Sequence, residues 1–218
     1  MLKAKVGYSK NVDAYEAGVE TAKTSTEGMD AKIALLFNSV GYDQKKLMEG
    51  IKSVATDVDV IGCTSSAGII TPDGYMIDES GTAGMLTLGG DDLTVACYGM
   101  AKGKSARETG REVAKKALEK AGLDYAPDYF FMSVSPAEEE EYIKGIQDVI
   151  GRVPCFGGSA ADNTVEGKWS IFYNDTIFND GVVAAFFYTA NDIATVYTGA
   201  YNETKDMGII TKLNDTRV

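Results

Sequence analysis

The chain has 218 residues, of which 44% are hydrophobic, and its 21 basic and 32 acidic residues give a net charge of −11. This length and composition suffice to bury one large core or two small ones, which excludes a wholly disordered protein. Only four arginines occur, which excludes a basic surface able to follow a nucleic acid backbone. No apolar run approaches the ~20 residues needed to cross a bilayer, and the N-terminus lacks the apolar stretch of a signal peptide. We therefore expect a cytoplasmic protein that binds neither nucleic acid nor membrane.

The sequence contains no histidine, which removes the usual partner of a catalytic serine or cysteine and the commonest nitrogen ligand of zinc. Its three cysteines, Cys63, Cys97 and Cys155, are widely spaced, so we interpret them as reduced thiols that are buried as small apolar side chains. We accordingly expect no metal and no cofactor.

Apolar residues recur at helical spacing in four segments, which predicts helices over residues 12–22, 43–55, 106–121 and 137–150. The last two begin with the spacing of a capping box, Ser105-x-x-Glu108 and Ser135-Pro136-x-Glu138. The acidic residues 138–141 then fall in a first helical turn, where the helix dipole favours them. We interpret this run as a solvated helix start.

Short runs of β-branched and aromatic residues predict ten strands between and after these helices. They cover residues 5–8, 33–38, 58–61, 84–88, 93–100, 129–134, 154–156, 169–173, 181–188 and 193–199. Helices and strands alternate before strands cluster, so we expect an α/β protein with mixed sheets.

The two halves of the chain repeat the same order of elements. Ile33 and Tyr129 open corresponding strands 96 residues apart, and Gly62 and Gly157 are 95 apart. This spacing predicts a duplicated βαβββ unit, with pseudo-repeats over about residues 30–100 and 126–200. Helices would cover mixed sheets, and a layered αββα-like sandwich is one arrangement that fits. Chance similarity of two α/β stretches is the alternative, because identity within the repeat is low.

Two turns rich in glycine and serine, one in each half, carry the strongest functional signal. The candidate ligand-binding residues of the first turn are Gly62, Cys63, Thr64, Ser65 and Ser66. Those of the second are Gly157, Gly158, Ser159, Ala160, Asp162 and Asn163. Glycine lets the backbone approach a ligand, hydroxyl groups add hydrogen bonds, and successive N–H groups can hold an anion. Turns that serve packing alone are the competing interpretation, and neither turn has the spacing of a phosphate-binding loop.

These turns lie within longer motifs that resemble a known family. The order VIGCTSSAG, then VPCFGGSAADN and DGVVAAFF, is similar to the FIST domain, and in particular to its N-terminal half, FIST N. The segment ALLFNSVGYDQKKLMEGIK resembles the same family's strand–helix entry. The similarity covers about residues 30–200, with Ile70 standing where a polar or acidic residue is expected. Residues 1–200 would form the FIST N-like domain, and residues 201–218 resemble the start of a C-terminal half.

The resemblance implies a cytosolic sensory domain of prokaryotic signal transduction, which acts alone or with a signalling output domain or protein. It further implies a small-molecule ligand, and amino acids are among the candidates. The absence of histidine and of a recognisable metal cluster predicts that the protein has no catalytic residue. A homodimer is left open. The predicted strand at 208–213 has no following partner, so we expect it to pack on a sheet edge or on a neighbouring molecule.

A sensor for a zwitterion needs N–H donors, an anion and an apolar wall. The two turns would supply the donors and Asp162 the anion. Candidate wall residues are Phe156, Phe172, Tyr173 and Trp169, of which Trp169 is better explained by core packing. The polar residues at 38–39 and 133–135 are better explained as helix caps.

Two further function classes stay open from the sequence. A metal-free lyase, isomerase or hydrolase would use Asp162 with Asp78 or Glu79 as acid and base. A protein-interaction module would dock basic partners on its acidic surface.

Overall fold

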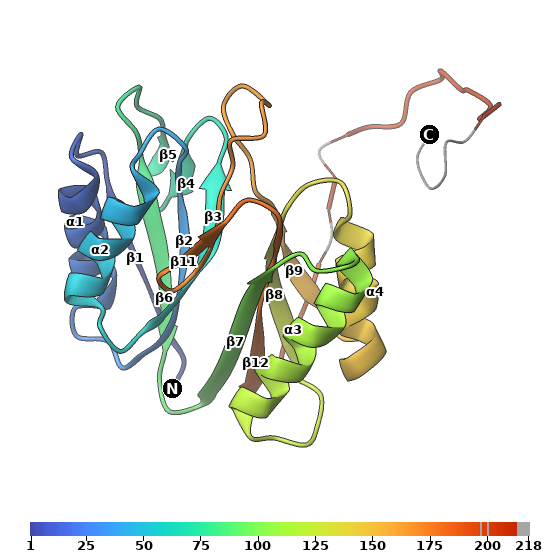
Figure 1. Cartoon of the computed structure of the whole chain (residues 1–218), viewed down its shortest axis with the longest axis horizontal. Coiled ribbons are helices and arrows are strands. Elements are labelled where there is room, and N and C mark those ends of the chain that lie inside the picture. The colour runs from blue at the N-terminus through green and yellow to red at the C-terminus, as the bar shows by residue number, and fades with distance from the viewer. Residues whose placement is uncertain (197, 200, 213–218) are drawn as a thin grey trace.

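Two β-sheets face one another, with a pair of helices on the outer side of each (Figure 1). This is a computed structural model, and it describes residues 1–196, 198–199 and 201–212. The elements are β1 (Lys3–Ser9), α1 (Ala14–Thr26), β2 (Ala31–Ser39), α2 (Gln44–Val54), β3 (Asp59–Ser65), β4 (Ile69–Thr71), β5 (Gly74–Met76), β6 (Ala83–Gly89), β7 (Leu93–Ala101), α3 (Ala106–Ala121), β8 (Tyr129–Val134), α4 (Glu139–Ile150), β9 (Cys155–Ser159), β10 (Ile171–Tyr173), β11 (Thr176–Phe178) and β12 (Gly181–Thr189). The mixed α/β class and the αββα layering expected from the sequence are confirmed.

The two main sheets share one topology. The first has the order β1-β6-β2-β3, and the second has the order β7-β12-β8-β9. In both, the closing strand, β6 or β12, is antiparallel to its two neighbours, and the last pair is parallel. The equivalent units therefore run over residues 3–89 and 93–189. Residues 93–101, grouped with the first half in the sequence analysis, open the second unit, because β7 pairs with β12.

The second unit also extends the first sheet. Its hairpin β10–β11 pairs antiparallel to β3, so the first sheet has six strands and the second has four. The corresponding hairpin of the first unit, β4–β5, pairs only with itself among the described residues. The added hairpin β10–β11 joins the two units through backbone hydrogen bonds to β3, in addition to the side-chain packing between the sheets.

The helices of each pair touch through glycines. Gly18 of α1 meets Gly50 of α2, and Gly110 of α3 meets Gly145 of α4, because a Cβ on any of the four would lie 2.0–2.4 Å from a backbone oxygen of the facing helix. Backbones this close leave no room for a larger residue. The same device in both helix pairs supports the pseudo-repeat.

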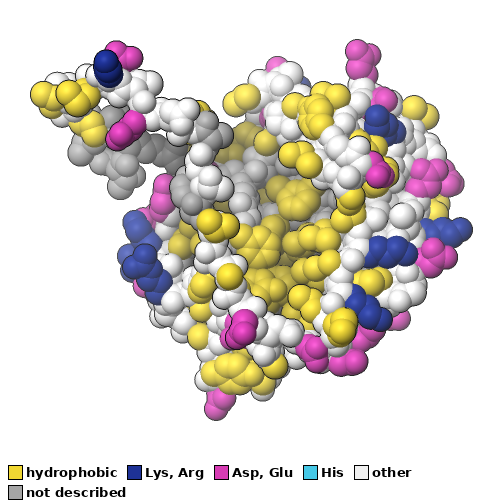
Figure 2. All heavy atoms as spheres, turned by 180° about the vertical axis from the view of Figure 1, so that it is seen from behind, with side chains coloured by type: hydrophobic (Ala, Val, Ile, Leu, Met, Phe, Trp, Pro, Cys, Tyr) yellow, Lys and Arg dark blue, Asp and Glu magenta, His cyan; other side chains and the backbone are white. Residues whose placement is uncertain are grey.

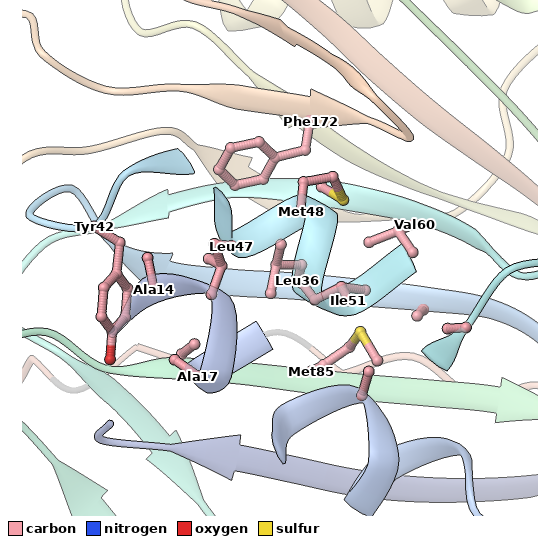
Figure 3. Packing of buried hydrophobic residues seen from close by; sticks show 14 residues of the cluster. Ala14, Ala17, Leu36, Tyr42, Leu47, Met48, Ile51, Val60, Met85 and Phe172 are labelled. Carbon is pink, nitrogen blue, oxygen red and sulfur yellow. The ribbon is translucent and has the colours of Figure 1, made fainter. Parts of the chain in front are cut away.

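Three apolar clusters fill the spaces between layers. Figure 3 shows the first, in which Leu47, Met48 and Ile51 of α2 pack on Leu36 and Met85 of the first sheet. A matching cluster lies between α3, α4 and the second sheet, and the third lies between the two sheets. The third cluster is incomplete on one side, and that side forms the cleft described below.

All four predicted helices are confirmed, whereas the caps predicted at residues 38–39 and at Ser135 are wrong, and Asp43 caps α2. Ser105 caps α3 by accepting a hydrogen bond from the Glu108 N–H, as its spacing predicts. Ser135 does not cap α4, since its Oγ accepts from the Gly181 N–H at 3.1 Å. Ser39 likewise accepts from the Thr82 N–H at 2.9 Å. Both serines hold the start of a closing strand, β6 or β12, to the end of its neighbour.

The strand predictions fail mainly after residue 189. Residues 193–196 and 198–199 form no strand, although a strand was expected at 193–199. Residues 208–212 of the predicted strand at 208–213 are exposed and form none, and residues 213–218 lie outside the described residues. Strands β4, β5 and β11 were not predicted, because three-residue hairpins bury too few side chains to leave a pattern. No described helix is long and apolar enough to span a membrane.

Candidate functional site

The two glycine- and serine-rich turns meet at the carboxyl ends of β3 and β9, which are parallel to their neighbours β2 and β8 in the two sheets. Thr64 Oγ1 donates to the Ala161 carbonyl oxygen at 2.8 Å, and the Ala161 N–H donates back to the Thr64 oxygen at 2.9 Å. The Ala67 N–H donates to Asn163 Oδ1 at 3.0 Å. Residues 97 positions apart are therefore bonded directly. The turns face one another, and the carboxyl ends of parallel strands are where α/β sheets usually bind ligands.

Beside this junction the sheets separate into a cleft of about 470 Å³. The residues that line it are Leu35, Phe37, Cys63, Thr64, Ser65, Ser66, Leu86, Phe131, Phe156, Gly157, Gly158, Ser159 and Ala161. Seven candidates from the sequence analysis are among them, from Cys63 to Ser66 and from Gly157 to Ser159. The described lining does not include Gly62, Ala160, Asp162 or Asn163.

The floor of the cleft is aromatic. Phe131 lies edge-on to Phe37 at a centroid distance of 6.2 Å and contacts Phe156 at 5.3 Å. Figure 2 shows hydrophobic side chains gathered in a hollow in the middle of this face of the molecule. Phe156 is 46% exposed, and Leu86 is half-buried at the opposite wall. None of the described lining residues is charged, so the cleft offers an apolar surface with hydroxyl and backbone groups at its rim.

Asp162 does not present its carboxylate to the cleft. The side chain is buried, and its two oxygens accept backbone N–H groups from Thr164, Glu166 and Lys168 at 2.7–3.1 Å. Burial alone would raise the pKa of Asp162, and the N–H groups of Lys168, Glu166 and Thr164 together outweigh it, so the pKa lies below its ordinary value. The carboxylate fixes the shape of the loop at 162–168, which leads the chain from β9 to β10.

Ser159 contacts a carboxylate that was expected only to match the helix dipole, Glu139 in the first turn of α4. Because Ser159 pairs with Val134, which packs toward α3 and α4, this contact lies on the helix side of the end of β9. Ser159 Oγ donates to Glu139 Oε1 at 2.7 Å, and Glu139 is partly buried. The spacing of 20 residues between the two gave no local signal. The pairing arises because α4 begins where β8 ends and β9 runs parallel to β8.

The cysteines divide into two kinds. Cys63 lines the cleft with its thiol buried, and burial raises its pKa to about 11, while the Ser133 hydroxyl lowers it slightly. Cys97 lies in the core between the sheets, as expected. The expectation that Cys155 is buried is wrong, because it lies exposed on β9. Edge position explains the difference, since no described strand covers the outer side of β9.

Of the four aromatic wall candidates, only Phe156 lines the cleft. Phe172 faces the first helix pair, and Tyr173 contacts Tyr98 at 5.4 Å on the far side of the sheet interface. Trp169 is partly buried and donates its indole N–H to the Asn179 oxygen at 2.8 Å, which agrees with a packing role.

The remaining candidates lie away from the cleft lining. Asp78 accepts the N–H and the hydroxyl of Ser80, so its carboxylate is used within a turn. Ile70 is 87% exposed on the β4–β5 hairpin, which borders the cleft through Ser65 and Ser66. Residue 70 thus stands near the mouth but offers no charge. Among the described residues no cluster of three or more potential metal ligands occurs.

A comparison with family models agrees with this architecture. The model of the FIST N domain matches residues 32–218. No curated protein matches the chain. Among solved structures, the chain is similar to the cyanuric acid hydrolase from A. caulinodans, with a TM-score of 0.44 and 10% identity over 86% of this chain and 72% of that one. At this TM-score the likeness carries no argument about activity. The family match spans most of the chain, and the protein belongs to the FIST family, whose domains act as sensors in signal transduction.

Proposed function

We propose that the cleft between the sheets binds a small metabolite, most simply an amino acid with an apolar side chain, and that the protein senses this ligand without turning it over. The observation that carries the proposal is the shape and chemistry of the cleft. A volume of about 470 Å³ with an aromatic floor and a polar rim matches the usual form of small-molecule sites. Phe37 and Phe131 would receive the apolar side chain.

The open edge of β9, beside the cleft, supplies groups for both ends of a zwitterion. Because Ser159 Oγ donates its hydrogen to Glu139, its lone pairs are left to accept from an ammonium group, and the nearby carboxylate favours the positive charge. Glu139 would thereby be the anion that balances the ammonium group, the role expected of Asp162 from the sequence.

Backbone donors are available for a carboxylate. The Phe130 N–H donates to the Pro154 oxygen, and the Ala160 N–H donates to the Val134 oxygen. Because alternate residues of a strand bond to the same neighbour, these two bonds show which residues of β9 direct their N–H groups toward β8. Even-numbered residues of β9 bond to β8, so the N–H groups of Gly157 and Ser159 point away from β8. A carboxylate at this edge would meet them without any cationic side chain, which suits a single negative charge better than a phosphate.

A ligand that settles between the sheets would hold the two units at one separation. Binding would then favour one arrangement of the units, and a signalling output domain or protein that distinguishes arrangements could read the change.

A thermal-shift screen of amino acids and related metabolites, followed by calorimetric titration, tests the proposal. A ligand that binds only the folded state raises Tm with concentration. Gly158→Leu would fill the cleft and abolish binding, whereas Gly158→Ala adds a Cβ in open space and should bind normally. Equal binding by both variants would place the site elsewhere, and turnover of the bound compound would overturn the sensory assignment.

A further inference from the structure

Among the sheet edges formed by the described residues, the edge of β9 is the one that lacks protection. Natural edge strands are shielded by charges, shortness or cover. The edge strand β1 carries Lys3 and Lys5, β11 has only three residues, and β7 exposes only Thr94 and Ala101. All five residues of β9 are exposed, and none is charged or proline.

The facing sheet leaves apolar side chains partly uncovered beside this edge. The two sheets cross, since β3 contacts β8 and β10 contacts β12, whereas β7 contacts both β2 and β10. The first sheet continues beyond β2 to β6, whereas the second stops at β9. The inner side chains of β6, Leu86 and Leu88, are therefore only partly buried. One further strand beside β9 would cover them.

The chain itself carries an unused strand-forming segment close to this edge. Residues 193–196 lie beside Pro154, Cys155 and Phe156 at the start of β9, so the polypeptide arrives at the edge after β12. The later residues 201–212 run outward from the body of the molecule (Figure 1). There Met207, Ile209 and Ile210 are 96%, 91% and 62% exposed. The match to the FIST N model includes this segment.

We propose that residues 207–212 add to the open edge of β9 as a strand of the same chain and roof the cleft. Position 207 is eleven Cα-to-Cα steps from position 196, and the reach of about 36 Å over these steps exceeds twice the ~17 Å length of β9, so either strand direction is accessible. Alternate side chains of the added strand would lie over Leu86 and Phe156. Its backbone would use the outward N–H groups of Gly157 and Ser159.

Those N–H groups are the ones assigned above to a ligand carboxylate. The segment and the ligand would therefore compete, which makes residues 207–212 an intramolecular regulator of the cleft. This consequence rests on the proposed function, whereas the docking of the strand does not.

Disulfide trapping in the ligand-free full chain tests the docking. Strand side chains alternate between faces, so only one of Ile209→Cys and Ile210→Cys can share a face with Cys155. Each of these two variants is first tested with native Cys155, at the start of β9. Each is then tested with Ser159→Cys, at the end of β9, in a protein that also carries Cys155→Ser. Cys63 and Cys97 are buried and do not compete. We expect an intramolecular disulfide to form at least about five-fold faster at one of the two positions.

Non-reducing electrophoresis separates the outcomes. Equal rates at the two positions, or no cross-link in either background, would overturn the proposal, and a disulfide-linked dimer would assign the edge to a second copy instead. As a second measurement, Ile209→Pro and Ile210→Pro each remove one N–H. Adjacent N–H groups point to opposite sides of a strand, so at least one of the two variants should speed the labelling of native Cys155 at least about three-fold, whereas Lys205→Pro should leave it unchanged. An unchanged labelling rate in both Ile209→Pro and Ile210→Pro would also contradict the docking. Neither readout needs a ligand, so a failure here leaves the proposed function to its own test.

Discussion

Gly62 and Gly157 occupy the same place in the two units of the molecule. Their φ angles are +148° and +139°, and a Cβ on either would lie 1.9 Å from the backbone oxygen of the neighbouring parallel strand, at Leu36 or Met132. Each glycine sits where a strand delivers its turn to the cleft. The equivalence supports a duplicated unit, and it explains why both turns contain glycine at this point rather than serine.

Replacing either glycine by alanine should destabilise the fold strongly. The new Cβ would force the paired strands apart and place alanine at a positive φ, so Gly62→Ala and Gly157→Ala should each lower the free energy of unfolding by at least about 2 kcal/mol. Urea denaturation measures this. Gly158→Ala is the matched control, because its Cβ meets nothing within 4 Å. An equally large fall in unfolding free energy for Gly158→Ala would show that neither the Cβ clash nor the positive φ causes the loss.

Asp162→Ala should loosen the loop at 162–168. The variant leaves the N–H groups of Thr164, Glu166 and Lys168 without their acceptor, so hydrogen exchange at these amides should accelerate while exchange in the helices stays unchanged. Asp175→Ala, in the exposed β10–β11 turn, should leave these amides unaffected. Slow exchange retained in Asp162→Ala would mean that the carboxylate does not organise the loop.

Glu139→Gln should weaken the binding of an amine-bearing ligand. Removal of the negative charge behind Ser159 should cost a charge-assisted hydrogen bond, or about 10- to 100-fold in Kd. An analogue of the ligand that lacks the amino group should bind both proteins equally. Equal losses for the two compounds would indicate a change of shape at the rim instead.

A single cysteine should react in the native protein. Cys155 is exposed, whereas Cys63 and Cys97 are buried and burial raises the pKa of both thiols. Loss of hydration around the Cys155 thiol also raises its pKa, so labelling is best measured near pH 8.5. We expect one thiol per native chain, three in urea, and none in native Cys155→Ser. Two or more reactive thiols without denaturant would contradict the closed packing between the sheets.

The link between α3 and α4 should weaken in acid. Hydrogen bonding by Arg107, with a further contribution from Arg111, outweighs desolvation and lowers the pKa of Asp148 to about 2. A depressed pKa in the folded state stabilises the fold above the ordinary aspartate pKa, and this contribution is lost as pH falls through the folded value. The stability difference between the parent protein and Asp148→Asn should therefore be constant above about pH 5, shrink as the pH falls, and lose its charge-dependent part below about pH 2. Urea unfolding across this range measures it, and a difference independent of pH would exclude the ion pairs as its source.

The helices could be predicted from the sequence because their signals are local. The apolar spacing of Leu47, Met48 and Ile51 identifies a helix before any partner is known, and Ser105 marks a helix start through its contact with Glu108. The repeat and the two glycine-rich turns were recognisable for a similar reason, since equivalent environments select glycine at equivalent positions. Most of the residues that line the cleft were found in this way.

Contacts between distant segments decided the rest. No local pattern shows that β7 joins the second sheet, that β10–β11 extends the first, or that Asp162 uses its oxygens within its own loop. Glu139 reaches Ser159 only because α4 starts at the end of β8, and Phe131 belongs to the cleft only because the second sheet stops at β9. Strand order and the direction of a side chain depend on which segments pair across the fold. Pairing is a property of the whole packed chain, so only the tertiary structure could decide it.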